Sequence, residues 1–161
     1  MLKGWLENNM FKKILKIIKE NFSEYNSWRL PDDKELSQEY HWEYEIRNIK
    51  NWNLFDSEKE FIKKAKEGKI VEIDKNFDDN IDYRSQTKSI ESLKELVSHY
   101  KFPRDVDRII KGFENNDSMP VPIVLKFSRG YRIMSGNTRL DTAFILGVRP
   151  KVLIVDVSDR K

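Results

Sequence analysis

The sequence predicts an α+β protein in which helices pack against a small mixed sheet. Helical periodicity of apolar residues runs through residues 2–22, 58–67 and 89–100. The final forty residues instead follow the order strand, turn, strand, helix, strand. A length of 161 residues allows one domain with an elaboration and argues against two full-sized domains. We therefore expect one hydrophobic core.

The composition excludes several classes of chemistry. The chain has no Cys, which rules out disulfides, thiolate nucleophiles, iron–sulfur clusters and Cys-containing zinc sites, and its two His residues rule out a His-rich metal site. Thirty Lys and Arg against 27 Asp and Glu leave a net charge of +3, which neither requires nor excludes nucleic acid. No stretch approaches the roughly 20 apolar residues that span a bilayer, so we expect a cytoplasmic protein without a membrane partner.

The N-terminal third has the weakest sequence signals for secondary structure. Residues 2–22 predict an amphipathic helix with lysines on one face, and residues 30–33 predict a turn into a second helix. All four tryptophans precede residue 53. Packing is the default interpretation of these features. A nucleic-acid or membrane-surface role for the lysines, and base stacking on the aromatic residues, remain open.

The middle of the chain predicts short alternating elements. Ser57 and Glu60 form a capping box for a helix over 58–67, and Gly68 is placed for a left-handed cap. Residues 70–73 alternate like a strand, and an acidic, Asn-rich loop is expected over 74–82.

The C-terminal half is predicted with sharper boundaries. A helix over 89–100 precedes another that is expected to open at Pro103. Two strands are expected at 120–127 and 131–134, joined by a tight turn. A helix follows them and is expected to end at Gly147. The apolar run 152–155 suits a buried strand.

The acidic loop has carboxylates at spacings similar to those of a calcium-binding loop. The match fails at position six, where Asp79 replaces the required Gly, and at position twelve, where Ser85 replaces a bidentate Glu. A looser Mg²⁺ site with Asp78, Asp79 and Asp82 as candidate ligands stays open beside a solvated loop.

The segment Ser135-Gly136-Asn137-Thr138-Arg139 is the better candidate site. Gly136 permits close approach of a ligand to the backbone, and the next residues open a helix whose N–H groups attract an anion. Thr138 adds a hydroxyl group, and the guanidinium of Arg139 can donate two parallel hydrogen bonds to an anion. The alternative is an ordinary turn with a helix cap and a solvated Arg.

These motifs together resemble the ParB/sulfiredoxin superfamily. The resemblance rests on Pro122-Ile123, the Gly136-to-Arg139 turn, Ala143 with Leu146-Gly147, and residues 152–155, in that order. It extends more weakly upstream through Asp82-Tyr83-Arg84 and covers about residues 69–158. We therefore divide the chain into a helical N-terminal elaboration packed on the core, 1–68, and a ParB/sulfiredoxin-like domain, 69–161. Similar stand-alone chains, many in bacteriophage genomes, carry the label ParB-like nuclease.

The resemblance implies a nucleotide-binding fold that holds ATP or another nucleotide. Phosphates are then expected at Gly136, Asn137, Thr138 and Arg139, with Arg84 as a second phosphate contact. The implied chemistry is Mg²⁺-dependent phosphotransfer or nucleotide hydrolysis, which needs positioned charge and no Cys. The candidate catalytic carboxylates are Glu72 and Asp78.

The turn also departs from three members of the superfamily: sulfiredoxin, the partitioning clamps and a kinase of free serine. Sulfiredoxin has Cys and His where this chain has Asn137 and Thr138, so its thiol chemistry is excluded. The partitioning clamps have Gly-Glu-Arg-Arg, and a serine kinase has Asp-Gly-His-Thr-Arg, which is nearest to this turn. Two other classes stay open: a nucleic-acid-binding protein or nuclease that uses Lys12, Lys13, Lys16, Lys19 and the tryptophans, and a non-catalytic interaction module.

Overall fold

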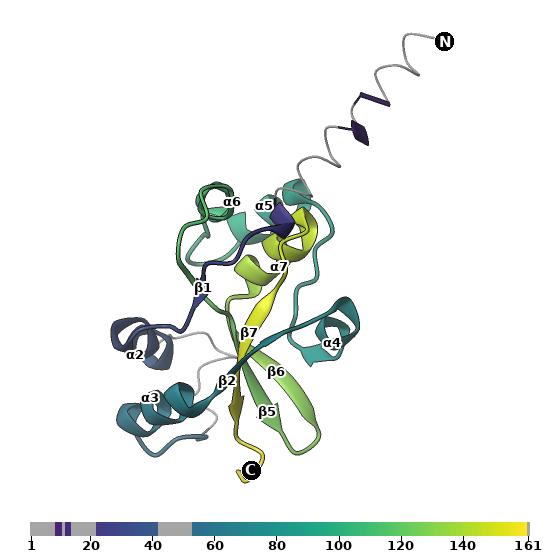
Figure 1. The fold of residues 1–161 in the computed structure, drawn as a ribbon. Helices are drawn as coiled ribbons and strands as arrows, with labels where there is room; N and C mark the ends of the chain where they lie inside the picture. The colour runs from purple at the N-terminus through teal and green to yellow at the C-terminus, as the bar shows by residue number, and fades with distance from the viewer. Residues whose placement is uncertain (1–8, 11, 14–21, 42–52, 161) are drawn as a thin grey trace.

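The computed structural model describes residues 9–10, 12–13, 22–41 and 53–160. It confirms the α+β class: a five-stranded mixed sheet is combined with six helices in this part of the chain (Figure 1). Most of the helix expected over residues 2–22, including Lys16 and Lys19, lies outside the described residues, as do Trp5, Trp42 and Trp52.

The sheet has the strand order β2-β7-β5-β6-β3. Its strands are β2 (Lys69–Glu72), β3 (Ile81–Asp82), β5 (Ile123–Phe127), β6 (Gly130–Ser135) and β7 (Lys151–Asp156). β5 lies parallel to β7 and antiparallel to β6, while β2 is antiparallel to β7 and β3 parallel to β6. Every strand predicted in this sheet is present, within a residue or two for most of them.

One predicted strand is divided. The expected run over 120–127 forms β5 and, before it, β4 (Met119–Pro120), which pairs with β1 (Trp28–Arg29) in a separate two-stranded ladder. The break falls at Val121 and Pro122, where the absence of a proline N–H interrupts a ladder. The Pro122 carbonyl instead accepts a hydrogen bond from the Leu153 N–H at 2.8 Å.

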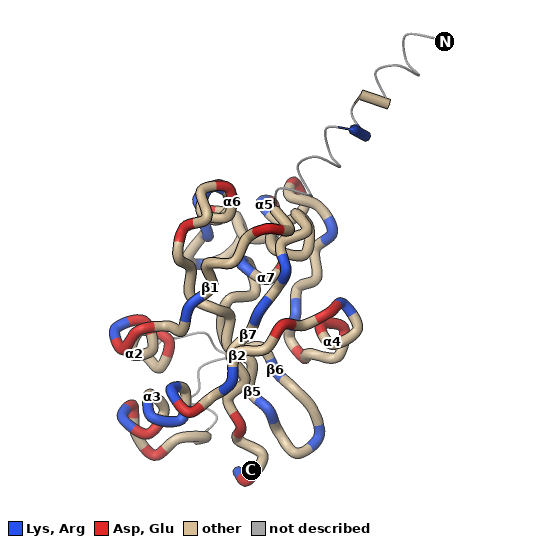
Figure 2. The backbone as a smooth tube through the Cα atoms, in the orientation of Figure 1, with Lys and Arg blue, Asp and Glu red and all other residues tan. Residues whose placement is uncertain are grey.

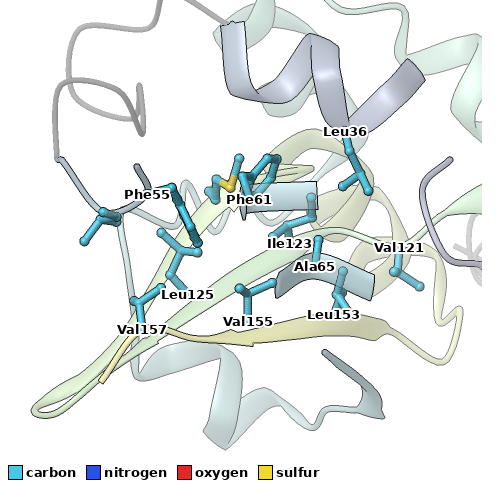
Figure 3. Close-up of a cluster of buried hydrophobic side chains, with 12 residues drawn as sticks. Leu36, Phe55, Phe61, Ala65, Val121, Ile123, Leu125, Leu153, Val155 and Val157 are labelled. Atoms are coloured by element: carbon cyan, nitrogen blue, oxygen red, sulfur yellow. The ribbon is translucent and has the colours of Figure 1, made fainter. Parts of the chain in front are cut away.

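Helices cover both faces of the sheet. Ile123 and Leu125 face α2 (Asp33–His41) and α3 (Glu58–Glu67), whose Leu36, Phe61 and Ala65 join the same buried cluster (Figure 3). Val124 between them faces the opposite cluster with Leu140 of α7 (Asn137–Leu146). This period-two alternation places residues from before and after position 68 in the same core.

The remaining helices contact α7. α5 (Ile90–Ser98) and α6 (Val106–Glu114) both pack on it, at the end of the sheet opposite the β5–β6 hairpin (Figure 1). The helix expected to open at Pro103 begins three residues later, because Asp105 caps it by accepting a hydrogen bond from the Arg108 N–H at 3.0 Å.

The acidic loop prediction is wrong in its secondary structure. Residues 75–79 form the helix α4 (Lys75–Asp79), and the Asp74 carboxylate caps it by accepting a hydrogen bond from the Phe77 N–H at 2.8 Å. Phe77 packs on Tyr131 with ring centroids 4.7 Å apart, so tertiary packing stabilises a helix too short to persist alone.

The Ser57 cap is confirmed, but the left-handed cap at Gly68 is not. The Ser57 hydroxyl accepts a hydrogen bond from the Glu60 N–H at 3.1 Å. Gly68 instead has φ −68°. A Cβ there would lie 2.7 Å from the Ile154 carbonyl oxygen, so glycine permits close packing of the backbone against β7.

Trp28 lies in a packed aromatic group. Its ring makes edge contacts with Tyr25 and Phe113, and its indole N–H donates to the Arg149 carbonyl at 3.0 Å. This arrangement fits a packing role for the described tryptophan. No helix among the described residues is both long and apolar enough to cross a membrane.

Candidate anion-binding site

The predicted phosphate turn joins β6 directly to α7. Gly136 has φ 90° and ψ 20°, a left-handed conformation that favours glycine. A Cβ at this position would lie 2.6 Å from the Pro122 Cβ, so the turn also needs glycine for space. Leu140 donates the first helical hydrogen bond, to the Gly136 carbonyl at 2.9 Å. The N–H groups of residues 137–139 therefore precede the helical pattern and form the positive end of α7.

A pocket of about 90 Å³ lies at this end of α7. Four separate parts of the chain line it: α2, the segment between α5 and α6, α6 itself, and the stretch from the end of β6 to the first turn of α7. Its lining residues are Glu39, Tyr100, Arg104, Ile109, Met134 and residues 135–139. A second hollow of about 180 Å³ adjoins it toward α2 and shares Glu39, Ser135 and Arg139.

Arg139 lies between the two hollows, and its Nε is buried without a hydrogen-bond partner among the described residues. Burial lowers the pKa of this guanidinium, the nearby Glu39 carboxylate raises it, and Arg104 lowers it further. A buried donor without an acceptor is unfavourable, and an anion in the pocket would supply one.

Glu39 is the one acid among the described residues that line the 90 Å³ pocket. Burial raises the pKa of its carboxyl group, while Arg139, a hydrogen bond with Ser135, and Arg104 act in the opposite direction. The site thus combines two arginines, a helix N-terminus and one carboxyl group whose pKa is raised by burial.

Arg84 occupies a different place from the one expected of a phosphate contact. Its side chain is 1% exposed and pairs with two carboxylates: Nε lies 2.5 Å from Asp78 Oδ1, and Nη2 lies 2.6 Å from Asp141 Oδ1. It also donates to Asn137 Oδ1. These buried partners neutralise the guanidinium, so it holds α7 in position against residues 83–87.

The side chain of Asn137 also bonds to that segment. Its Oδ1 accepts a hydrogen bond from the Ser85 N–H at 3.1 Å, and its Nδ2 donates to the Tyr83 carbonyl at 2.8 Å. Asn137 lines the pocket, but these bonds engage its side-chain amide with residues 83–85. Thr138 and Gly136 line the pocket as predicted.

The predicted carboxylates are not at this pocket. Glu72 lines a separate hollow with Asp74 and Arg149. Asp78, which is fully buried, pairs with Arg84 and with Lys75. The remaining two predicted ligands are paired as well, Asp79 with Lys75 at 3.2 Å and Asp82 with Arg132 at 3.9 Å.

These carboxylates do not fit a Mg²⁺ site, because a cation already engages each of Asp78, Asp79 and Asp82. Within the described ranges, no group of three or more His, Cys, Asp or Glu side chains is placed to hold a metal ion. No mechanistic step is therefore assigned to a bound metal.

The sequence prediction missed Glu39 and Arg104. Glu39 belongs to a mostly polar helix almost a hundred residues before the turn, and Arg104 follows a proline in a loop. Neither has a local pattern that distinguishes it, because only tertiary packing brings them to α7.

No family model, curated protein or solved structure matches this chain.

Proposed function

We propose that this chain binds a nucleotide through its phosphates at the N-terminal end of α7. The observation that carries the proposal is Arg139, whose buried Nε lacks an acceptor among the described residues and lies beside the three backbone N–H groups that precede the helical pattern of α7. A phosphate group bonds well to such a combination of charged and backbone donors. The resemblance of the turn to the ParB/sulfiredoxin superfamily supports a nucleotide as the source of the phosphate.

Arg104 is the second cation of the proposed site, in the role that the sequence suggested for Arg84. It lines the pocket from the segment between α5 and α6, opposite the turn. Two arginines near one pocket repel each other, and a bound anion would relieve this repulsion.

The pocket also has an apolar wall. Tyr100, Ile109 and Met134 lie among its lining residues beside the proposed phosphate position. An aromatic ring next to a phosphate cradle suits the base or ribose of a nucleotide, which needs both polar and apolar contacts.

Binding is the part of the proposal that the geometry supports best. Phosphotransfer or hydrolysis would need a group that positions the attacking oxygen, and the expected carboxylates Glu72 and Asp78 do not line the pocket. Turnover is therefore a separate measurement from affinity.

Isothermal titration calorimetry against ATP, ADP, CTP and GTP, each with Mg²⁺, tests the proposal. Inorganic phosphate is titrated separately as the reference ligand. We expect at least one nucleotide to bind with one site per chain and tighter than phosphate alone. Absence of binding by every nucleotide and by phosphate would contradict the proposal and favour a non-catalytic interaction module.

A further inference from the structure

The proposed phosphate position faces a carboxyl group as well as donors. Glu39 reaches the pocket from α2, and it lies close enough to Arg139 for the two charges to interact. A carboxylate beside a phosphate dianion in a buried pocket repels it, because burial weakens the screening of like charges.

One shared proton removes this repulsion. A phosphate monoester has a second pKa near 6, so its terminal oxygen carries a proton readily around neutral pH. A protonated phosphate oxygen donates a hydrogen bond to a carboxylate, and a protonated carboxyl group donates one to a phosphate oxygen. Both arrangements hold the same proton between the two groups.

We infer that the site binds the terminal phosphate of a monoester together with one proton held between that phosphate and Glu39. The inference rests on the proposed function, and it names the ligand class more narrowly. A phosphodiester, such as a nucleic-acid backbone, brings no proton of its own, so it is discriminated against wherever Glu39 is ionised.

The surroundings of Glu39 are consistent with such a proton. Arg139 of α7, Arg104 of the segment before α6, and the Ser135 hydroxyl at the end of β6 favour its ionised form, whereas burial and Glu35 on its own helix oppose it. These opposing effects leave a raised pKa, so Glu39 takes up a proton more readily than an exposed glutamate.

The direct test counts the protons taken up on binding. Methyl phosphate is titrated calorimetrically in two buffers of different ionisation enthalpy at a pH of about 8, where the free ligand is a dianion. We expect the wild-type protein to take up about one proton per ligand bound, and its affinity to fall about tenfold between pH 7 and 8.

The variant Glu39→Gln removes the need for this proton, because its amide donates a hydrogen bond to the dianion directly. We expect proton uptake near zero, an affinity independent of pH over the same range, and tighter binding than wild type at the higher pH. Asp33→Asn, on the exposed part of α2, is the control and should retain the wild-type proton count.

Dimethyl phosphate provides the matched diester. At a pH of about 6, where half the monoester already carries its proton, wild type should bind methyl phosphate more tightly than dimethyl phosphate. Glu39→Gln should lose most of this preference.

The outcomes separate the two proposals. Binding of methyl phosphate without proton uptake overturns the proton-sharing inference. Equal affinity for the diester overturns its restriction to monoesters. Either result leaves the phosphate site intact. Failure of the wild type to bind nucleotide or methyl phosphate at any pH overturns both. The wild-type proton count decides the matter even where Glu39→Gln does not fold.

Discussion

Two arginines near the start of α7 have opposite surroundings. Arg84 is buried between Asp78 and Asp141, which neutralise it and accept its hydrogen bonds. Arg139 is held near a carboxyl group, with its Nε buried and unpartnered within the described residues. The first stabilises the fold, and we expect the second to bind the ligand.

This difference predicts opposite effects of the same substitution. Arg84→Met leaves Asp141 buried without its cation and Asp78 with Lys75 alone, and it should lower the free energy of unfolding by about 3–5 kcal/mol. Arg139→Met removes a buried donor that lacks an acceptor and should change it by less than about 1 kcal/mol. Urea denaturation of the two variants measures both; equal losses would mean that Arg139 is structural as well.

Glu39 gives the stability a definite dependence on pH. Because its pKa is raised in the folded protein, the folded state binds a proton more tightly than the unfolded state. The free energy of unfolding therefore decreases as the pH rises from the pKa of Glu39 in the unfolded state to its pKa in the folded state. Glu39→Gln lacks this loss, so its stability relative to wild type should be greater at a pH of about 8 than at about 4.

Chemical denaturation of wild type and variant at both pH values checks this sign. The comparison cancels the titration of groups that do not interact with Glu39, such as Asp156, whose pKa is lowered by its hydrogen bonds with Ser158. A stability difference that is the same at both pH values would show that Glu39 is not perturbed by folding.

At the scale of the element, α7 begins and ends on left-handed glycines. Gly136 has φ 90° and Gly147 φ 81°, and the Val148 N–H bonds back to the Ala143 carbonyl at 2.9 Å. The two glycines have different roles, because Gly136 belongs to the proposed site and Gly147 only ends the helix.

Gly147→Val should therefore affect stability alone. A β-branched residue in the left-handed region is expected to cost roughly 1–2 kcal/mol, whereas Gly147→Asn should cost less. Thermal unfolding compares the two, and nucleotide affinity of the folded protein should match wild type. A selective loss of affinity without a change in melting temperature would identify Gly147 as a ligand contact.

Elements with strong local signals were predictable, and those fixed by distant contacts were not. The caps at Ser57 and Gly147 and the final strand follow from neighbouring residues, and the structure confirms them. α4 escaped prediction because its Asp and Asn residues favour loops, and burial of Phe77 and Asp78 overrides that preference. The turn of the candidate site was visible in the sequence, but the pairing of Arg84 with Asp141 spans 57 residues and was not.

At the scale of the whole molecule, acidic and basic residues alternate along much of the described chain (Figure 2). Figure 2 shows acidic and basic segments interleaved along α2 and α3, without a long tract of one sign on either helix. The described lysines at positions 12 and 13 are exposed, but the basic face predicted for residues 2–22 lies mostly outside the described residues.

Salt dependence distinguishes a local anion site from an extended nucleic-acid surface. A protein that contacts six to ten backbone phosphates loses about 10³–10⁵ in affinity between 50 and 200 mM salt, whereas a site for one nucleotide should lose about tenfold or less. Calorimetric titration with the nucleotide at several salt concentrations over this range measures the slope of log affinity against log salt concentration. A steep slope, together with tight binding of DNA or RNA, would favour the nucleic-acid alternative.

The affinity of Arg139→Met for its best nucleotide tests the central claim most directly. Loss of a charge-assisted hydrogen bond should weaken binding by about 1.5–3 kcal/mol, without unfolding the protein. Arg129→Met, in the exposed β5–β6 turn, is the matched control and should bind like wild type. Equal affinity in wild type and Arg139→Met would contradict a phosphate site at the N-terminus of α7.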